Sequence, residues 1–154
     1  MKIADVKCVG IIGAGVMGGG IAQNAILCGT KVLVRDLTDE INEKARDTIV
    51  NSRFGIKGGL DRGKHTQEEY DKALSLLNFT TDTADLKDVD LLIEAIGGGD
   101  TGQLEDKPLK LKIFSELEET VKKEAVFASN TSTFSITDLA AATKRPEQFI
   151  GMHW

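Results

Sequence analysis

The sequence is poor in cysteine, since Cys8 and Cys28 are the two thiols among its 154 residues. They lack the spacing of metal ligands, so we expect no metal site, and they are typical of a reducing cytosol or matrix. The chain also lacks an excess of positive charge: its net charge of −5 argues against a nucleic-acid partner. No apolar run is long enough to span a membrane, and residues 1–6 do not resemble a signal peptide. We therefore expect a cytoplasmic protein without membrane contact.

Strand and helix patterns alternate along the chain. Short apolar runs predict strands covered on both faces, at Lys7–Ile12, Lys31–Arg35, Val89–Ala95, Ala125–Ser129 and Phe149–His153. Helices are expected from Ile21 to Cys28, Thr38 to about Asn51, Thr66 to about Leu77, Pro108 to about Lys123, and Ile136 to Ala142, with a turn over Phe54–Lys64. The alternation predicts an α/β fold with a Rossmann-type, doubly wound, mainly parallel sheet, and residues 1–154 have the length of one domain.

A glycine-rich turn follows the first predicted strand, with Gly13, Gly15 and Gly18 in the order G-x-G-x-x-G. The first glycine permits a tight turn, the second leaves room for a pyrophosphate, and the third lets helix and strand pack closely. The N-terminus of the following helix offers free N–H groups and a positive dipole end to phosphates. We therefore expect a dinucleotide to bind at Gly13, Ala14, Gly15, Val16, Met17 and Gly18.

An acidic residue, Asp36, directly follows the second predicted strand and lies eighteen residues after Gly18. A carboxylate at this place can accept hydrogen bonds from both hydroxyls of the adenosine ribose, which predicts NAD as the cofactor. Arg35, directly before it, leaves NADP as an alternative, because a cation there could favour a 2′-phosphate.

Longer motifs accompany the glycine turn. They are I-G-A-G-V-M-G at Ile12–Gly18, G-I-A-Q at Gly20–Gln23, L-L-I-E-A-I at Leu91–Ile96, E-D-K-P-L-K at Glu105–Lys110, A-S-N-T-S at Ala128–Ser132 and R-P-E-Q-F-I-G-M-H at Arg145–His153. In these motifs the chain resembles the NAD-binding domain of 3-hydroxyacyl-CoA dehydrogenases, notably the 3-hydroxybutyryl-CoA type. The resemblance implies NAD(H) as cofactor. For a full-length protein it implies an acyl-CoA substrate, a C-terminal helical domain that this chain lacks, and a homodimer.

The resemblance also implies roles for individual residues. His153 corresponds to the base that takes the hydroxyl proton of a 3-hydroxyacyl-CoA while hydride passes to the nicotinamide. Ser132 corresponds to the serine that hydrogen-bonds the substrate oxygen. The cofactor contacts expected beyond the glycine turn and Asp36 are Ala95, Ile96, Glu105, Lys110 and Asn130.

The chain departs from the family pattern at two places. Eight residues, Gly97–Leu104, stand where the family usually has one, and we expect a mobile polar loop whose removal does not unfold the domain. The chain also stops on its last predicted strand, so we expect part of a longer protein that, alone, does not turn over substrate. Two other functions stay open: an NAD-binding module without turnover, and a domain of a related hydroxy-acid or polyol reductase.

Overall fold

A single parallel sheet organises the computed structural model, which describes residues 3–97 and 105–154. Within these residues the sheet has six strands in the order β3-β2-β1-β4-β5-β6, and all neighbouring strands are parallel. This order confirms the doubly wound, Rossmann-type prediction. The expected loop at Gly97–Leu104 lies, except for Gly97, outside the described residues, so its behaviour stays a prediction.

The strands end in register at one edge of the sheet. Ile12 pairs with Glu94, Glu94 pairs with Ser129, and Ser129 pairs with Gly151. The segments that follow these strands therefore start side by side, which is where ligands bind in such sheets. The strands are β1 Cys8–Ile12, β2 Lys31–Arg35, β3 Leu77–Thr80, β4 Leu91–Glu94, β5 Val126–Ser129 and β6 Phe149–Gly151.

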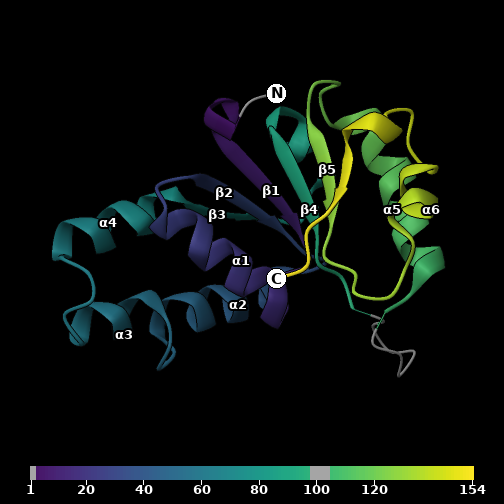
Figure 1. The fold of residues 1–154 in the computed structure, drawn as a ribbon. Helices are drawn as coiled ribbons and strands as arrows, with labels where there is room; N and C mark the ends of the chain where they lie inside the picture. The colour runs from purple at the N-terminus through teal and green to yellow at the C-terminus, as the bar shows by residue number, and fades with distance from the viewer. Residues whose placement is uncertain (1–2, 98–104) are drawn as a thin grey trace.

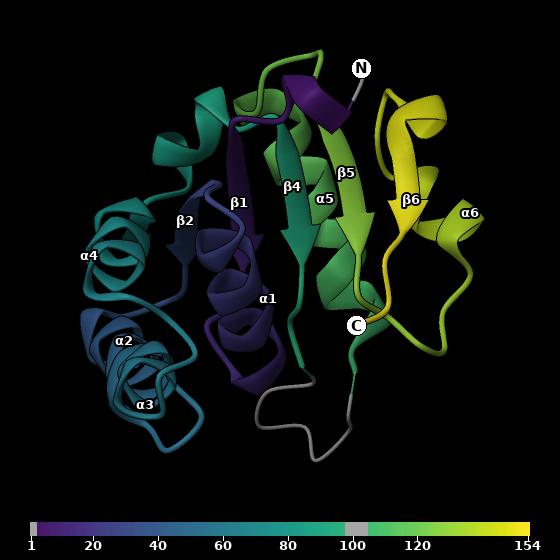
Figure 2. The same ribbon diagram turned by 60° about the vertical axis from the view of Figure 1, so that its left-hand side comes forward.

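Helices cover both faces of the sheet. The α-helices are α1 Val16–Leu27, α2 Asp39–Asn51, α3 Ile56–Asp61, α4 Gln67–Leu76, α5 Lys107–Thr120 and α6 Ile136–Ala140; the 3-10 helices are η1 Ile3–Asp5, η2 Thr83–Asp88 and η4 Pro146–Gln148. Helices α1–α4 lie on one side of the sheet and α5 and α6 on the other (Figure 1). Turned by 60°, the molecule shows α1 in front of the strands and α5 behind them (Figure 2).

Two hydrophobic cores result, one on each face. Ile11 of β1 packs with Ile21 and Ile49 under α1 and α2, whereas Ile12 packs with Phe114 and Phe127 under α5. Consecutive residues of β1 enter opposite cores because side chains of a strand alternate between the two faces. No helix in the described ranges is long and apolar enough to cross a membrane.

The predicted turn over Phe54–Lys64 is wrong in part, because α3 forms inside it. Ile56 is completely buried, and the packing of this one apolar side chain outweighs the helix-breaking tendency of its glycine neighbours. Strand β3 was not predicted. It lies at the edge of the sheet, and one of its four side chains, Leu77, is buried, so its sequence lacks an apolar run.

Several predicted boundaries also move. Helix α1 starts at Val16, five residues before the predicted Ile21, because Gly15 is its N-cap and Gly18 already belongs to its first turn. Strand β6 ends at Gly151, so His153 lies beyond the strand and not on it. The helix starts expected at Thr38 and Thr66 are confirmed as caps: the Thr38 side chain accepts a hydrogen bond from the Ile41 N–H, and Thr66 forms a capping box with Glu69.

The carboxylate of Asp90 connects the amino end of β1 to the amino end of β4. Asp90 accepts hydrogen bonds from the backbone N–H groups of Lys7 at 2.7 Å and Cys8 at 2.9 Å, and from Lys122 Nζ at 2.5 Å. Burial opposes its ionisation, but the ammonium and the two N–H donors outweigh burial and lower the pKa of Asp90. The ionised carboxylate therefore stabilises the contact between the start of β1 and the connection that follows α5.

Replacing Asp90 with asparagine tests this contribution. We expect D90N to lower the free energy of unfolding at neutral pH by about 1–3 kcal/mol, the range for hydrogen bonds to a charged group. Because the pKa of Asp90 is lower in the folded state, its stabilisation is present above the unfolded pKa and is lost as pH falls through the folded pKa. Urea unfolding should therefore show the difference from the wild type shrinking below about pH 4; a pH-independent difference would contradict the account.

Candidate functional site

The glycine turn connects β1 to α1 with little space around two of its glycines. Gly13 has a φ of +100°, and a Cβ there would lie 2.7 Å from the Ala95 carbonyl oxygen. A Cβ on Gly18 would lie 1.8 Å from the Gly13 carbonyl oxygen, which no real side chain can do. A Cβ on Gly15 would meet nothing within 4 Å. The turn is thus closed toward the protein and open at the helix N-terminus, as a pyrophosphate requires.

Asp36 lies at the same turn. Its Oδ2 accepts a hydrogen bond from the Ala14 N–H at 2.6 Å, and its Oδ1 accepts one from the Leu37 N–H at 2.7 Å. The carboxylate is half-buried and lines a small cavity of about 120 Å³. The other residues around this cavity are Ile12, Gly13, Arg35, Leu37, Ile96, Leu109 and Ile113. Arg35 Nε donates to the Thr81 carbonyl oxygen at 3.3 Å, on the side of β3.

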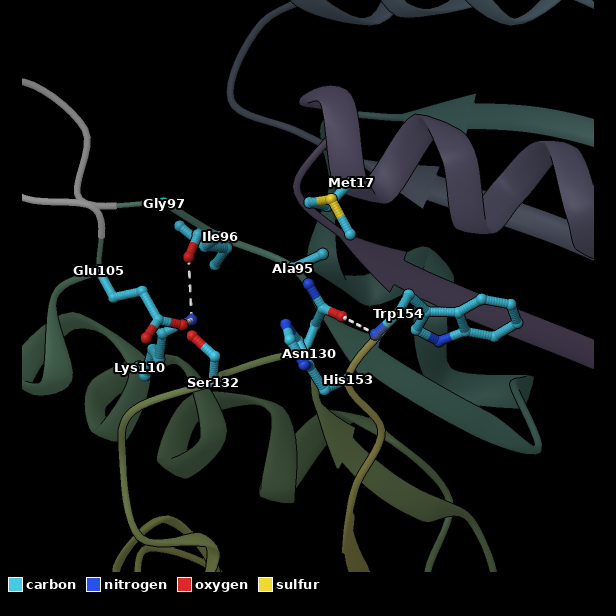
Figure 3. Close-up of a pocket in the computed structure, with 10 residues that line it drawn as sticks. All are labelled: Met17, Ala95, Ile96, Gly97, Glu105, Lys110, Asn130, Ser132, His153 and Trp154. Atoms are coloured by element: carbon cyan, nitrogen blue, oxygen red, sulfur yellow. Dashed lines mark hydrogen bonds and ion pairs between the residues drawn. The ribbon is translucent and has the colours of Figure 1, made fainter.

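A second cavity, of about 240 Å³, brings together most of the remaining predicted residues. In Figure 3, Glu105, Lys110 and Ser132 lie on one side of it, while Asn130 and His153 lie on the other. The remaining lining residues are Met17, Ala95, Ile96, Gly97 and Trp154. Ile96 lines both cavities, so they are neighbours along the carboxyl edge of the sheet.

Lys110 is buried among oxygen atoms, with 1% of the residue exposed. Its Nζ donates to Glu94 Oε1 at 2.5 Å and to the Ile96 carbonyl oxygen at 2.9 Å, and Glu105 Oε1 lies 3.5 Å away. Glu105 also accepts hydrogen bonds from the hydroxyls of Thr131 at 2.8 Å and Thr133 at 2.5 Å. Burial raises the pKa of Glu105, but these hydroxyls and the Lys110 ammonium outweigh it, so the net pKa is lowered.

Glu94 is a site residue that the sequence did not identify. It is completely buried, and besides Lys110 it accepts hydrogen bonds from the Ser129 hydroxyl at 2.5 Å and the Ile96 N–H at 2.6 Å. The one available signal was a carboxylate that ends an otherwise apolar strand. That position alone does not reveal its partners, because Lys110 comes from a helix sixteen residues further along the chain.

The segment that carries His153 contacts the loop after β5. The Met152 N–H donates to the Ser129 carbonyl oxygen at 3.0 Å, and the Trp154 N–H donates to Asn130 Oδ1 at 2.9 Å. These two bonds place His153, which is exposed, at the rim of the larger cavity beside Asn130 (Figure 3).

The turn, the carboxylate after β2 and the open helix N-terminus define a dinucleotide-binding α/β domain. The family model of the 3-hydroxyacyl-CoA dehydrogenase NAD-binding domain matches residues 8–154. The chain therefore belongs to the NAD-binding domains of the 3-hydroxyacyl-CoA dehydrogenase family. This membership confirms the resemblance in the sequence and NAD as the cofactor of the domain.

Known relatives agree with the family and extend further than this chain. A 3-hydroxybutyryl-CoA dehydrogenase of Mycobacterium tuberculosis is 41% identical over 97% of this chain and 49% of its own length. A fatty acid oxidation complex subunit alpha of Pseudomonas syringae is 39% identical over 99% of this chain and 20% of its own. The crystal structure of (S)-3-hydroxybutyryl-CoA dehydrogenase from Ralstonia eutropha matches with a TM-score of 0.87 and 36% identity, over 97% of this chain and 49% of that one. The chain thus spans half or less of the length of these relatives.

Alanine substitutions at two glycines of the turn should lower stability by unequal amounts. Gly18→Ala forces a Cβ against the Gly13 carbonyl oxygen, so we expect the free energy of unfolding to fall by about 1–3 kcal/mol, as for other overpacked sites. Gly15→Ala meets no atom and should cost less than about 1 kcal/mol. Urea unfolding of both variants checks this, and equal losses would mean that the close approach at Gly18 is not needed.

Proposed function

We propose that this chain is the cofactor-binding part of an NAD-dependent enzyme that interconverts 3-hydroxyacyl-CoA and 3-oxoacyl-CoA. The observation that carries the proposal is the shared cavity at the carboxyl edge of the sheet, where Ser132, His153 and Lys110 lie beside the glycine turn. The names of the relatives support the acyl-CoA substrate class. For the full-length protein we also propose a homodimer in the cytoplasm.

In this proposal, bound NAD supplies the hydride acceptor, and the residues of this chain position the reactants. His153 takes the proton from the substrate hydroxyl, because an imidazole ionises close to neutral pH. Ser132 donates a hydrogen bond to the same oxygen. Glu105, Lys110 and Asn130 bind the nicotinamide half of the cofactor, and Ala95 and Ile96 contribute their backbone.

The adenosine half of NAD is assigned to the smaller cavity. Each Asp36 oxygen accepts one backbone hydrogen bond and retains capacity for a further donor, so both ribose hydroxyls can bind there. A 2′-phosphate would be repelled by this carboxylate. Arg35 contacts the Thr81 carbonyl oxygen on the side of β3, which favours NAD over NADP.

A valine in place of Gly15 should prevent cofactor binding without unfolding the domain. Its side chain would fill the open space at the N-terminus of α1, where we place the pyrophosphate. Calorimetric titration with NAD should detect binding to the wild type and none to G15V, with circular dichroism as the control for folding. Equal NAD affinity in the two proteins would refute the assigned pyrophosphate position.

The Asp36→Asn variant tests cofactor choice. The amide keeps the shape of the side chain but loses the charge, so we expect NAD affinity to fall by about 1–3 kcal/mol and the preference over NADP to shrink. Titrations of both proteins with both cofactors give the comparison. Tighter binding of NADP than NAD by the wild type would overturn this assignment of Asp36.

We further propose that residues 1–154 alone bind NAD but do not turn over substrate at a useful rate. Orienting the hydroxyl against both a base and the nicotinamide can contribute roughly 7–11 kcal/mol to catalysis, and the relatives use about twice this length of chain. The rate of NADH formation from 3-hydroxybutyryl-CoA should be the same for the unmodified chain and for the His153→Ala variant. Robust turnover that the substitution abolishes would show that this chain carries the complete active site.

A further inference from the structure

Glu94 connects β4 to α5 and β5 beside the larger cavity but does not line the cavity itself. It ends β4, its partner Lys110 belongs to α5, and its partner Ser129 ends β5. Its third partner is the N–H of Ile96, in the segment that separates the two cavities. A completely buried carboxylate with three donors has a fixed position, and so do the groups that donate to it.

From these contacts we propose that Glu94 is a positioning residue for the nicotinamide half of NAD. The inference rests on the proposed function, in which Lys110 and the Ala95–Ile96 backbone contact that half. Glu94 acts through them, since its own oxygens are fully buried.

The orientation of the Lys110 ammonium follows from its acceptors. An ammonium has three N–H donors. Glu94 and the Ile96 carbonyl oxygen accept two of them at 2.5 and 2.9 Å, whereas Glu105, which lines the cavity, lies at 3.5 Å. That distance exceeds ordinary hydrogen-bond length, so among the described residues the third N–H has a long contact alone, with a carboxylate that lines the cavity.

Removing the charge of Glu94 should change this orientation. Among the described residues, the Lys110 ammonium would then have Glu105 as its one ionic partner, and it would move toward it, into the cavity. The Ile96 N–H would also lose its charged acceptor. Both changes affect the nicotinamide end, whereas the Glu94 side chain makes no hydrogen bond or ion pair with the glycine turn or with Asp36.

Ligand titration of the Glu94→Gln variant tests the proposal. The amide is isosteric, so the side chain at position 94 keeps its volume while its charge is lost. We expect E94Q to bind NAD about tenfold more weakly, the effect of one hydrogen bond to a charged group. ADP carries the adenosine and the two phosphates without the nicotinamide half, so its affinity should stay within about twofold of the wild type, well below that tenfold effect.

Two further variants make the test specific. Asp90→Asn is the matched control, because Asp90 directly precedes β4 and also pairs with a lysine, but at the opposite edge of the sheet. It should leave the ratio of NAD to ADP affinity unchanged. In a Lys110→Met background, E94Q should cause a clearly smaller loss of NAD affinity, because the contact with the Ile96 N–H is then the one route that remains.

Three results would overturn the inference: unchanged NAD affinity in E94Q, equal losses for NAD and ADP, or an undiminished loss in the Lys110→Met background. If the wild type bound neither ligand, the proposed function itself would fail. Should E94Q not fold, Ser129→Ala removes one donor to Glu94 and keeps the charge. Ser129→Ala should then weaken the binding of NAD, by less than the tenfold expected for E94Q, and leave the binding of ADP unchanged. An equal loss of affinity for ADP would contradict the proposal.

Discussion

The close approach of α1 to the end of β1 is the constraint on which the site depends. Gly18 leaves no room for a side chain between the helix and the turn, and Gly13 leaves none between the turn and the segment after β4. The N-terminus of α1 therefore lies at the carboxyl edge of the sheet, close to the end of β1. The same geometry brings the Ala14 N–H to Asp36, so the phosphate and ribose positions are determined together.

The other half of the site depends on a buried ionic network instead of on backbone shape. The network consists of Glu94 at the end of β4, Lys110 in α5, and Glu105, which lies two residues before α5. Their hydroxyl partners, Ser129, Thr131 and Thr133, belong to the end of β5 and the loop after it. Separating paired charges that are buried costs much free energy, so this network favours one arrangement of the cavity.

The sequence predicted much of the fold because parallel strands covered on both faces are continuous apolar runs. The buried strands β1, β4 and β5 were found within a few residues, and so was the inner strand β2, although the exposed fraction of its residues alternates. Edge strand β3 and helix α3 were missed, since each depends on one or two buried side chains, such as Leu77 and Ile56, in otherwise polar or glycine-rich sequence.

The candidate site was predicted as a set of residues but not as a set of contacts. The motifs named Lys110 and Glu105 correctly as neighbours of the cavity, yet nothing in their spacing showed that Glu94 is the main partner of Lys110. Contacts between side chains on different elements depend on the register of strands and helices, which local patterns do not contain. The resemblance to a family supplied the residues, and the three-dimensional structure supplied their partners.

The central claim is that one dinucleotide extends from Asp36 across the glycine turn into the cavity at Lys110. Titrating the ¹⁵N-labelled chain with NAD and following its amide resonances tests this most directly. The account predicts shifts at Gly13–Gly18 and Asp36, and also at Ala95–Gly97 and Asn130–Ser132, whereas ADP should shift the first group and Ile96, which lines both cavities, but not Asn130–Ser132. Shifts confined to one of the two groups with NAD, or located elsewhere on the domain, would contradict it.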